Sequence, residues 1–283
     1  MTVTITTYAK LNLSLRVYAP REDNYHPLQS MFQTISLHDT LSVTTRSEKG
    51  IHIECNDPTV PTDNKNILHK TYEALKDRLP VGITVNLNKR IPHGAGMAGG
   101  STNAAGLLTY LNDTYLKLPL EELIPIATSL GADVPFFLIG GTAFVEGIGE
   151  HITPIEPQSN YSHYLLVKPP IYCSTKDIFT LFDASTPEKD PGKQNKEILT
   201  QHLNTNDLKD TVFKLDPRFQ ETEDIISELT NSTVYMSGSG STLFTPITEE
   251  TYKSILPTLQ SKLADTFIEL CSPIHGPAIT IQI

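Results

Sequence analysis

Hydrophobic and polar residues alternate at the start of the chain. From residue 3 to residue 17, apolar side chains occupy nearly every odd position, and polar side chains, among them Lys10 and Asn12, occupy the even positions. A period of two predicts a β-strand with one buried face and one polar face. Lys10 and Asn12 should therefore lie on the same, polar face of this strand.

The pattern further along the chain predicts an α+β fold. Helical spacing of apolar residues alternates with stretches of period two, and the second half combines helices with an antiparallel sheet. Pro125 lies inside one helical stretch, where it should cause a kink or a break. Strands are predicted at 34–37, 41–45, 51–54, 81–87, 142–146, 163–168, 232–236, 242–247, 266–271 and 278–283, and helices at 66–79, 101–116, 119–130 and 249–263.

Turn-forming residues suggest how the chain is divided. Glycines and prolines cluster near residue 150, and these residues interrupt regular structure. We therefore predict two domains, residues 1–150 and residues 151–283. A polar, turn-rich segment at 183–196 is predicted to be a surface loop or partly disordered.

The densest signal in the sequence is a glycine-rich stretch directly before a predicted helix. A loop with small side chains lets backbone N–H groups approach an anion, and a helix that follows directs further N–H donors to the same point. This stretch therefore predicts a phosphate-binding loop, the glycine loop. It comprises Pro92, His93, Gly94, Ala95, Gly96, Met97, Ala98, Gly99, Gly100, Ser101 and Thr102.

Three interpretations of the glycine loop compete. The dinucleotide fingerprint G-x-G-x-x-G matches, but the acidic residue that it requires about 20 positions later falls on Glu121, at the start of a helical stretch. The P-loop pattern nearly matches, but Gly100 occupies the position of its lysine. A phosphate site of that kind must borrow positive charge from elsewhere in the chain. The third interpretation is a flexible loop without a ligand.

Composition narrows the possible partners. The 283 residues carry a net charge of −10, which argues against a nucleic-acid partner but permits a locally positive nucleotide pocket. The three cysteines form no C-x-x-C pair, so neither a zinc site nor a disulfide framework is indicated. The apolar run at 134–139 is too short to span a membrane, and we see no signal peptide. A cytoplasmic protein without a membrane partner is expected.

Two further segments are informative because of their positions relative to the other motifs along the chain. Gly131-Ala132-Asp133-Val134-Pro135 places an acid beside an apolar stretch, and a second glycine loop occupies residues 237–242. Together with Ala9-Lys10-Leu11-Asn12-Leu13 and residues 92–106, they occur in the order typical of the GHMP kinase superfamily, which the chain resembles over nearly its whole length. The run Arg21…Asp23-x-Tyr25-His26 narrows the resemblance to the branch whose substrate is a cytidine diphosphate ester of methylerythritol.

The resemblance implies an S5-like N-terminal domain, a ferredoxin-like C-terminal domain and an active-site cleft between them. It implies transfer of the γ-phosphoryl group of ATP to the 2-hydroxyl of the methylerythritol unit. On chemical grounds, Mg²⁺ is expected to accompany ATP. Asp133 would be the catalytic base, Lys10 would keep it ionised, and Asn12 would orient the acceptor. No metal ligands are indicated by the sequence.

The resemblance also implies how the cytidine diphosphate group is held. Tyr25 and Phe179 would stack on the two faces of the base, His26 would hydrogen-bond its edge, and Thr175 would complete the site. Asn24 replaces a glycine of the family pattern but tolerates a left-handed backbone. Ala95 and Ala98 also replace glycines, so each needs ordinary backbone angles or a small shift of the loop.

Other activities remain open at this point. A GHMP kinase for mevalonate-pathway or sugar substrates has the same motifs, and a dinucleotide-dependent reductase would use the fingerprint glycines. A monomer and a homodimer are equally compatible with the sequence.

Overall fold

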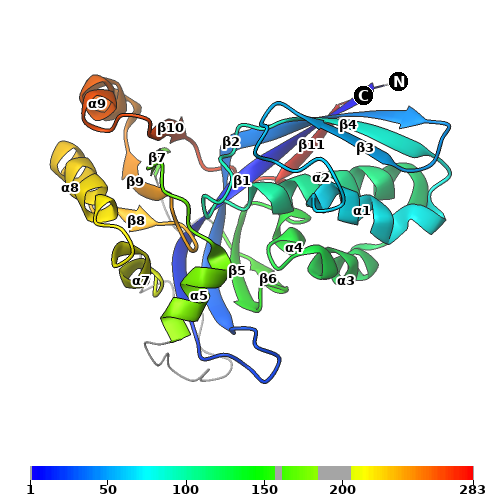
Figure 1. Ribbon diagram of the computed structural model, residues 1–283, viewed down its shortest axis with the longest axis horizontal. Coiled ribbons are helices and arrows are strands. Elements are labelled where there is room, and N and C mark those ends of the chain that lie inside the picture. Colours follow the sequence, from blue (N-terminus) through cyan, green and yellow to red (C-terminus); the bar gives the residue numbers. More distant parts are fainter. Residues whose placement is uncertain (1, 157–160, 184–204, 283) are drawn as a thin grey trace.

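The computed structural model describes residues 2–156, 161–183 and 205–282, and this part of the chain forms two sheets with helices packed against them (Figure 1). Most of the predicted loop at 183–196 lies outside these residues. The seven-stranded sheet contains β1 (Thr2–Val17), β2 (Leu28–Arg46), β3 (Ile51–Cys55), β4 (Gly82–Asn88), β5 (Thr142–Gly147), β6 (His151–Pro154) and β11 (Ile279–Gln282). The four-stranded sheet contains β7 (His163–Lys168), β8 (Tyr235–Met236), β9 (Leu243–Ile247) and β10 (Phe267–Cys271).

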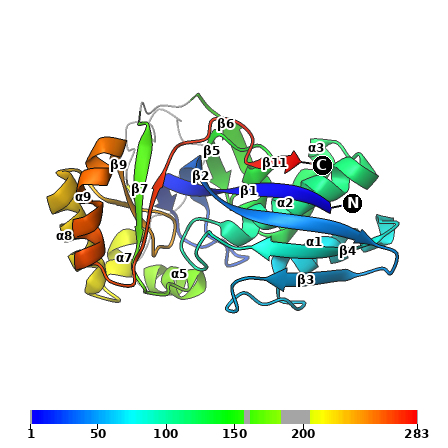
Figure 2. The same cartoon turned by 90° about the horizontal axis from the view of Figure 1, so that it is seen from above.

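The seven-stranded sheet is mostly antiparallel. Its main path runs β11-β1-β2-β4-β3, β5 pairs with β2 and β6, and within it only β3 and β4 pair in parallel. A dinucleotide fold requires a mostly parallel sheet with crossover helices. The dinucleotide interpretation of the glycine loop is therefore wrong. Figures 1 and 2 show the helices of this half on one side of the sheet: α1 (Ile67–Leu75), α2 (Gly99–Leu111), α3 (Leu120–Leu130) and α4 (Val134–Phe137).

The four-stranded sheet has the order β10-β7-β9-β8, and all of its pairs are antiparallel, as predicted. Leu165 and Val167 of β7 share a hydrophobic cluster with Ile226 and Leu259 of the two helices that cover this sheet. The helices of this half are α5 (Thr175–Asp183), α7 (Lys209–Phe213), α8 (Arg218–Thr230) and α9 (Glu249–Lys262).

The two sheets do not part at residue 150. Strands β6 and β11 both follow that residue, yet both pair within the seven-stranded sheet. The end of the chain returns to its beginning, with Gln282 opposite Thr4. The domain boundary at 150 stays a prediction, and the C-terminal strand completes the sheet in which the chain starts.

Strand β1 connects the two halves. It contributes Ile5 to the core under the seven-stranded sheet, Leu11 to a cluster between the sheets and Leu15 to the core of the second half. From Ala9 to Leu15 every residue is buried, so the expectation of one buried face holds only for the first part of the strand. The reason is that the middle of β1 lies between two packed layers. Lys10 and Asn12 are therefore buried polar residues.

The predicted elements are found with few exceptions. The strands predicted at 34–37 and 41–45 are one long strand, β2, and helix α3 runs without a break through Pro125. A proline removes one N–H donor, and the remaining bonds of α3 keep the helix intact here. Helices α4, α5, α7 and α8 and strand β6 were not predicted. Within the residues described, no helix is both long and apolar enough to cross a bilayer.

Candidate active site

A cleft of about 920 Å³ is lined by residues of two sequence motifs, the one that contains Lys10 and the one that contains Asp133. Strand β1 and the turn before α4 place Lys10 and Asp133 on its wall. Met97 and Thr102 of the glycine loop do not line it, because both side chains are buried beneath the loop. The predicted residues that do line the cleft are Lys10, Asn12, Tyr25, His26, Pro92, His93, Gly94, Ala95, Gly96, Ala98, Gly99, Gly100, Ser101, Asp133, Thr175 and Phe179.

Lys10 and Asp133 form an ion pair in this cleft. The Lys10 Nζ lies 3.5 Å from the Asp133 Oδ2, 4.3 Å from the centre of the Phe32 ring, and donates a 2.5 Å hydrogen bond to the Asn12 Oδ1. The Lys10 side chain is 4% exposed and that of Asp133 is 32% exposed. Burial lowers the pKa of the Lys10 ammonium, and the attraction of Asp133 opposes this shift. The lysine is thus enclosed while the carboxylate stays open to the cleft.

Asn12 is held in one orientation by its neighbours. Its Nδ2 donates to the Ser30 Oγ at 2.9 Å, so its Oδ1 is the atom that faces Lys10. Its backbone N–H donates to the Ser237 Oγ at 3.1 Å, and that hydroxyl donates to the Gly96 carbonyl at 2.9 Å. Ser237 therefore joins β1, the glycine loop and the second glycine loop at one point.

The small residues of the glycine loop allow close packing on both sides. A Cβ on Gly96 would collide with the Ser237 carbonyl, and a Cβ on Gly99 would lie 2.7 Å from the Lys89 Nζ. The loop is also tied to β1, because the Lys10 N–H donates to the Met97 carbonyl at 3.2 Å. Helix α2 begins at Gly99, so its free N–H groups face the cleft.

Ala98 departs from the expected backbone geometry. It adopts left-handed angles, φ 55° and ψ 34°, directly before α2. Of the two alternatives predicted for Ala98, ordinary backbone angles are therefore wrong, whereas Ala95 does not have a positive φ. Asn24, by contrast, has a φ of 64°, as expected from its tolerance of that region.

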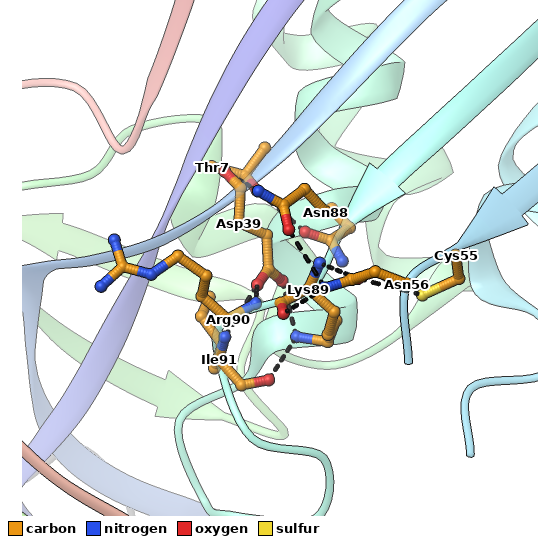
Figure 3. Close-up of polar contacts among 9 residues, drawn as sticks. Thr7, Asp39, Cys55, Asn56, Asn88, Lys89, Arg90 and Ile91 are labelled. Atoms are coloured by element: carbon orange, nitrogen blue, oxygen red, sulfur yellow. Dashed lines mark hydrogen bonds and ion pairs between the residues drawn. The ribbon is translucent and has the colours of Figure 1, made fainter. Parts of the chain in front are cut away.

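A second lysine lies beside the glycine loop, and sequence reasoning missed it. The Lys89 Nζ donates to the Asp39 Oδ2 and the Ile91 carbonyl, each at 2.6 Å (Figure 3). The other oxygen of Asp39 accepts the backbone N–H groups of Arg90 and Ile91, at 2.7 and 2.8 Å. Burial lowers the pKa of Lys89, and Asp39 opposes the shift. The signal in the sequence was the Lys-Arg pair just before Pro92.

Lys89 places a positive charge beside the glycine loop. Its ammonium lines the cleft next to Gly99, the first residue of α2. The glycine loop has Gly100 at the position of the P-loop lysine, so its positive charge must come from another part of the chain. The structure brings both Lys10 and Lys89 to the cleft, so a bound polyphosphate has two cations within the same cavity. Asp39 comes from β2, and Lys89 directly follows the last residue of β4 (Figure 3).

One end of the cleft carries the aromatic residues. Tyr25 is 58% exposed, and the His26 ring lies 5.0 Å from the Phe179 ring at an angle of 49°. Thr175 begins α5, and its hydroxyl lies 3.0 Å from the Ser239 hydroxyl of the second glycine loop. The structure thus brings together four substrate-site candidates from two distant segments.

The other end of the cleft was not predicted. It is lined by Val60, Pro61, Asn66 and Ile67, around the start of α1. Asn66 accepts the Leu68 N–H as the N-cap of that helix. The sequence showed an asparagine before a helical run, which indicates a cap but not a ligand site.

The fold and this site define the class of the protein. Residues 66–141 match the family model described as GHMP kinases N terminal domain. The crystal structure of a Methanococcus jannaschii mevalonate kinase has the same fold, with a TM-score of 0.67 over 96% of this chain and 98% of that one at 16% identity. The chain has the GHMP kinase fold and is an ATP-dependent small-molecule kinase.

Sequence comparison identifies the branch. A 4-diphosphocytidyl-2-C-methyl-D-erythritol kinase of Clostridium kluyveri is 37% identical over 85% of this chain and 89% of the relative. One of Clostridium perfringens is 40% identical over 71% and 69%. A crystal structure of 4-(cytidine 5'-diphospho)-2C-methyl-D-erythritol kinase superimposes with a TM-score of 0.75, at 29% identity, over 95% of this chain and 99% of that one. The chain belongs to the 4-diphosphocytidyl-2-C-methyl-D-erythritol kinase family.

Proposed function

We propose that this protein transfers the γ-phosphoryl group of ATP to the 2-hydroxyl of 4-diphosphocytidyl-2-C-methyl-D-erythritol. The observation that carries the proposal is the Lys10–Asp133 ion pair, at 3.5 Å, in one cleft with the glycine loop and an aromatic end. Phosphoryl transfer needs positioned groups and neutralised charge more than covalent chemistry. The cleft offers a base, two lysines and a row of backbone donors for that purpose.

Asp133 acts as the base in this proposal. Its carboxylate is open to the cleft and accepts the proton of the acceptor hydroxyl as the oxygen attacks the γ-phosphorus. The bond from phosphorus to the β,γ-bridging oxygen breaks, and ADP leaves. Lys10 places its ammonium beside the Asp133 carboxylate and, being enclosed by Asn12 and Phe32, stays in one position. These contacts favour proton transfer from a hydroxyl held beside both groups.

The glycine loop and Lys89 hold the polyphosphate. The N–H groups at the start of α2 bind phosphate oxygens, and Lys89 compensates their charge. Mg²⁺ is expected to enter with ATP. Ser101 and Asp133 both line the cleft and present oxygen ligands of the kind that Mg²⁺ prefers. The nucleoside of ATP then lies at the end of the cleft that is lined by Val60 and Asn66, because this end adjoins the glycine loop.

The aromatic end receives the cytidine. Tyr25 and Phe179 offer planar surfaces for stacking, and His26 offers a ring nitrogen to the edge of the base. A simple sugar or mevalonate has no planar group to use this end of the cleft. The proposal therefore favours the cytidine diphosphate substrate over the other GHMP kinase substrates. The proposed function also includes a cytoplasmic location. Whether the protein is a monomer or a homodimer can be measured by light scattering.

A substrate assay tests the proposal. The purified protein is given ATP, Mg²⁺ and either the cytidine diphosphate substrate or mevalonate, and ADP formation is followed. We expect turnover with the first compound alone. Turnover of mevalonate without turnover of the cytidine compound would show that the proposed substrate is wrong.

A variant tests the role of the base. Asp133→Asn should lower kcat by about 10²–10⁴-fold while ATP still binds. Asp113→Asn, at an exposed aspartate outside the cleft, serves as the control and should keep its rate. A normal rate in Asp133→Asn removes Asp133 as the base.

A further inference from the structure

Asp183 faces His26 at the aromatic end of the cleft. The two residues come from distant segments, and the His26 Nε2 lies 3.4 Å from the Asp183 Oδ1. The His26 side chain is 8% exposed and that of Asp183 is 40% exposed. Asp183 lines the cleft together with His26.

The partner of the other ring nitrogen determines whether the His26 Nε2 is a hydrogen-bond donor or acceptor. The His26 Nδ1 lies 2.8 Å from the Tyr18 carbonyl oxygen, which can only accept a hydrogen bond. The Nδ1 therefore carries the proton, and in a neutral imidazole the Nε2 is an acceptor. His26 Nε2 and Asp183 Oδ1 are then two acceptor atoms side by side. This arrangement is complementary to a group that has two N–H donors on one atom.

Helix α5 presents Asp183 to the cleft together with its neighbours. Lys176, Phe179, Thr180 and Asp183 all line the cleft, and their spacing of three, one and three residues is that of one helix face. The Phe179 ring lies 5.0 Å from the His26 ring. A planar base stacked on Phe179 would lie next to the His26 ring and its contact with Asp183.

We propose that Asp183, paired with His26, makes the site specific for cytosine by accepting a hydrogen bond from the exocyclic amine of the base. The amine nitrogen of cytosine has two N–H donors, one for the carboxylate and one for the His26 Nε2. Uracil has an oxygen acceptor at the same position, which the carboxylate repels. Asp183 is thus a residue that determines specificity in the phosphorylation of a cytidine diphosphate substrate, and the inference rests on the function proposed above.

The asparagine variant offers the sharpest test. Asp183→Asn keeps the shape of the side chain but supplies an N–H₂ group that suits the uracil oxygen. We expect the ratio of kcat/KM for the cytidine substrate to that for its uridine counterpart to fall by about 10-fold or more. The KM for ATP should not change, because Asp183 is at the aromatic end of the cleft.

A matched control lies on the same helix. Asp177→Asn makes the same chemical change at an exposed position that does not line the cleft, and it should keep the wild-type ratio. Binding of CDP and UDP, measured by calorimetry, gives the same comparison without catalysis. An unchanged ratio in Asp183→Asn, or equal losses for both nucleotides, overturns the proposal.

The outcomes separate this inference from the proposed function. If the wild-type protein phosphorylates the cytidine and uridine substrates equally well, the specificity proposal fails and the kinase function stands. If it phosphorylates neither but accepts another alcohol, the proposed function itself fails. A preference for cytidine that Asp183→Asn relaxes supports both.

Discussion

The Asp39 carboxylate and the Lys89 ammonium form a buried ion pair, 2.6 Å apart, beneath the start of the glycine loop. The Asp39 side chain is 0% exposed and that of Lys89 is 5% exposed. Asp39 also accepts the N–H groups of Arg90 and Ile91, the last residues before Pro92. The pair therefore fixes both the course of the chain into the loop and the position of a cation beside it.

Asp39→Ala should destabilise the protein strongly. The change leaves a buried lysine without its partner and two buried N–H groups without an acceptor, which typically costs about 3–5 kcal/mol. Urea denaturation measures the loss in the free energy of unfolding. Glu73→Ala, which breaks the exposed pair with Lys76, is the control and should leave the midpoint unchanged. Equal midpoints for the two variants would contradict the role of the buried pair.

Lys10→Met should separate activity from stability. The variant loses the ammonium that pairs with Asp133 in the cleft, and we expect kcat to fall by about 10²–10³-fold. The melting temperature should stay the same or rise, because burial of the lysine outweighs its attraction to Asp133, which remains hydrated at 32% exposure. A melting temperature several degrees lower would show that the pair stabilises the fold.

The lowered pKa of Lys10 predicts how activity depends on pH. The folded-state pKa lies below the ordinary value of 10.5. Lys10 must be protonated to act, so kcat should fall on the alkaline side at a pH below 10.5. For stability, the burial cost is fully present at a pH below the folded-state pKa, where the lysine is charged in both the folded and the unfolded state. That cost is relieved as the pH rises from the folded-state pKa toward 10.5. A kcat that stays constant up to pH 10.5 disagrees with this assignment.

Ala98→Gly should stabilise the protein. A left-handed backbone costs an alanine about 1–2 kcal/mol, and glycine avoids this cost at the expense of a more flexible unfolded chain. We expect a net gain of about 0.5–1 kcal/mol in the free energy of unfolding. Ala95→Gly, where the alanine does not have a positive φ, is the matched control and should lose stability. If both changes lower the melting temperature, the strain at Ala98 is not real.

Tyr25→Ala should weaken binding of the cytidine substrate alone. Stacking on a base contributes about 1–3 kcal/mol, or roughly 5- to 150-fold in affinity. The KM for the cytidine substrate should rise accordingly, and the KM for ATP should not change. Tyr161→Ala replaces a similarly exposed tyrosine that does not line the cleft and serves as the control. Equal losses for both substrates argue against base stacking.

Local patterns predicted most of the elements and the motifs on them. The alternation in β1 placed Lys10 and Asn12 on one face, and their side chains do contact each other. Helices α4 and α7 have four and five residues, too few to show a helical period, and the longer helices α5 and α8 were also missed. The break at Pro125 did not occur, since packing of the α3 face outweighs the loss of one backbone bond.

The sequence by itself determined the strands and helices, the glycine loop and the chemical types of the reacting groups, because these depend on residues close together in the chain. It pointed to Asp133 and Lys10 only through a family resemblance. Tertiary structure alone brought these two residues to 3.5 Å, buried Asp39 against Lys89, and set Asp183 opposite His26. Such contacts join segments far apart in the chain, and their geometry depends on how the layers pack rather than on any local pattern.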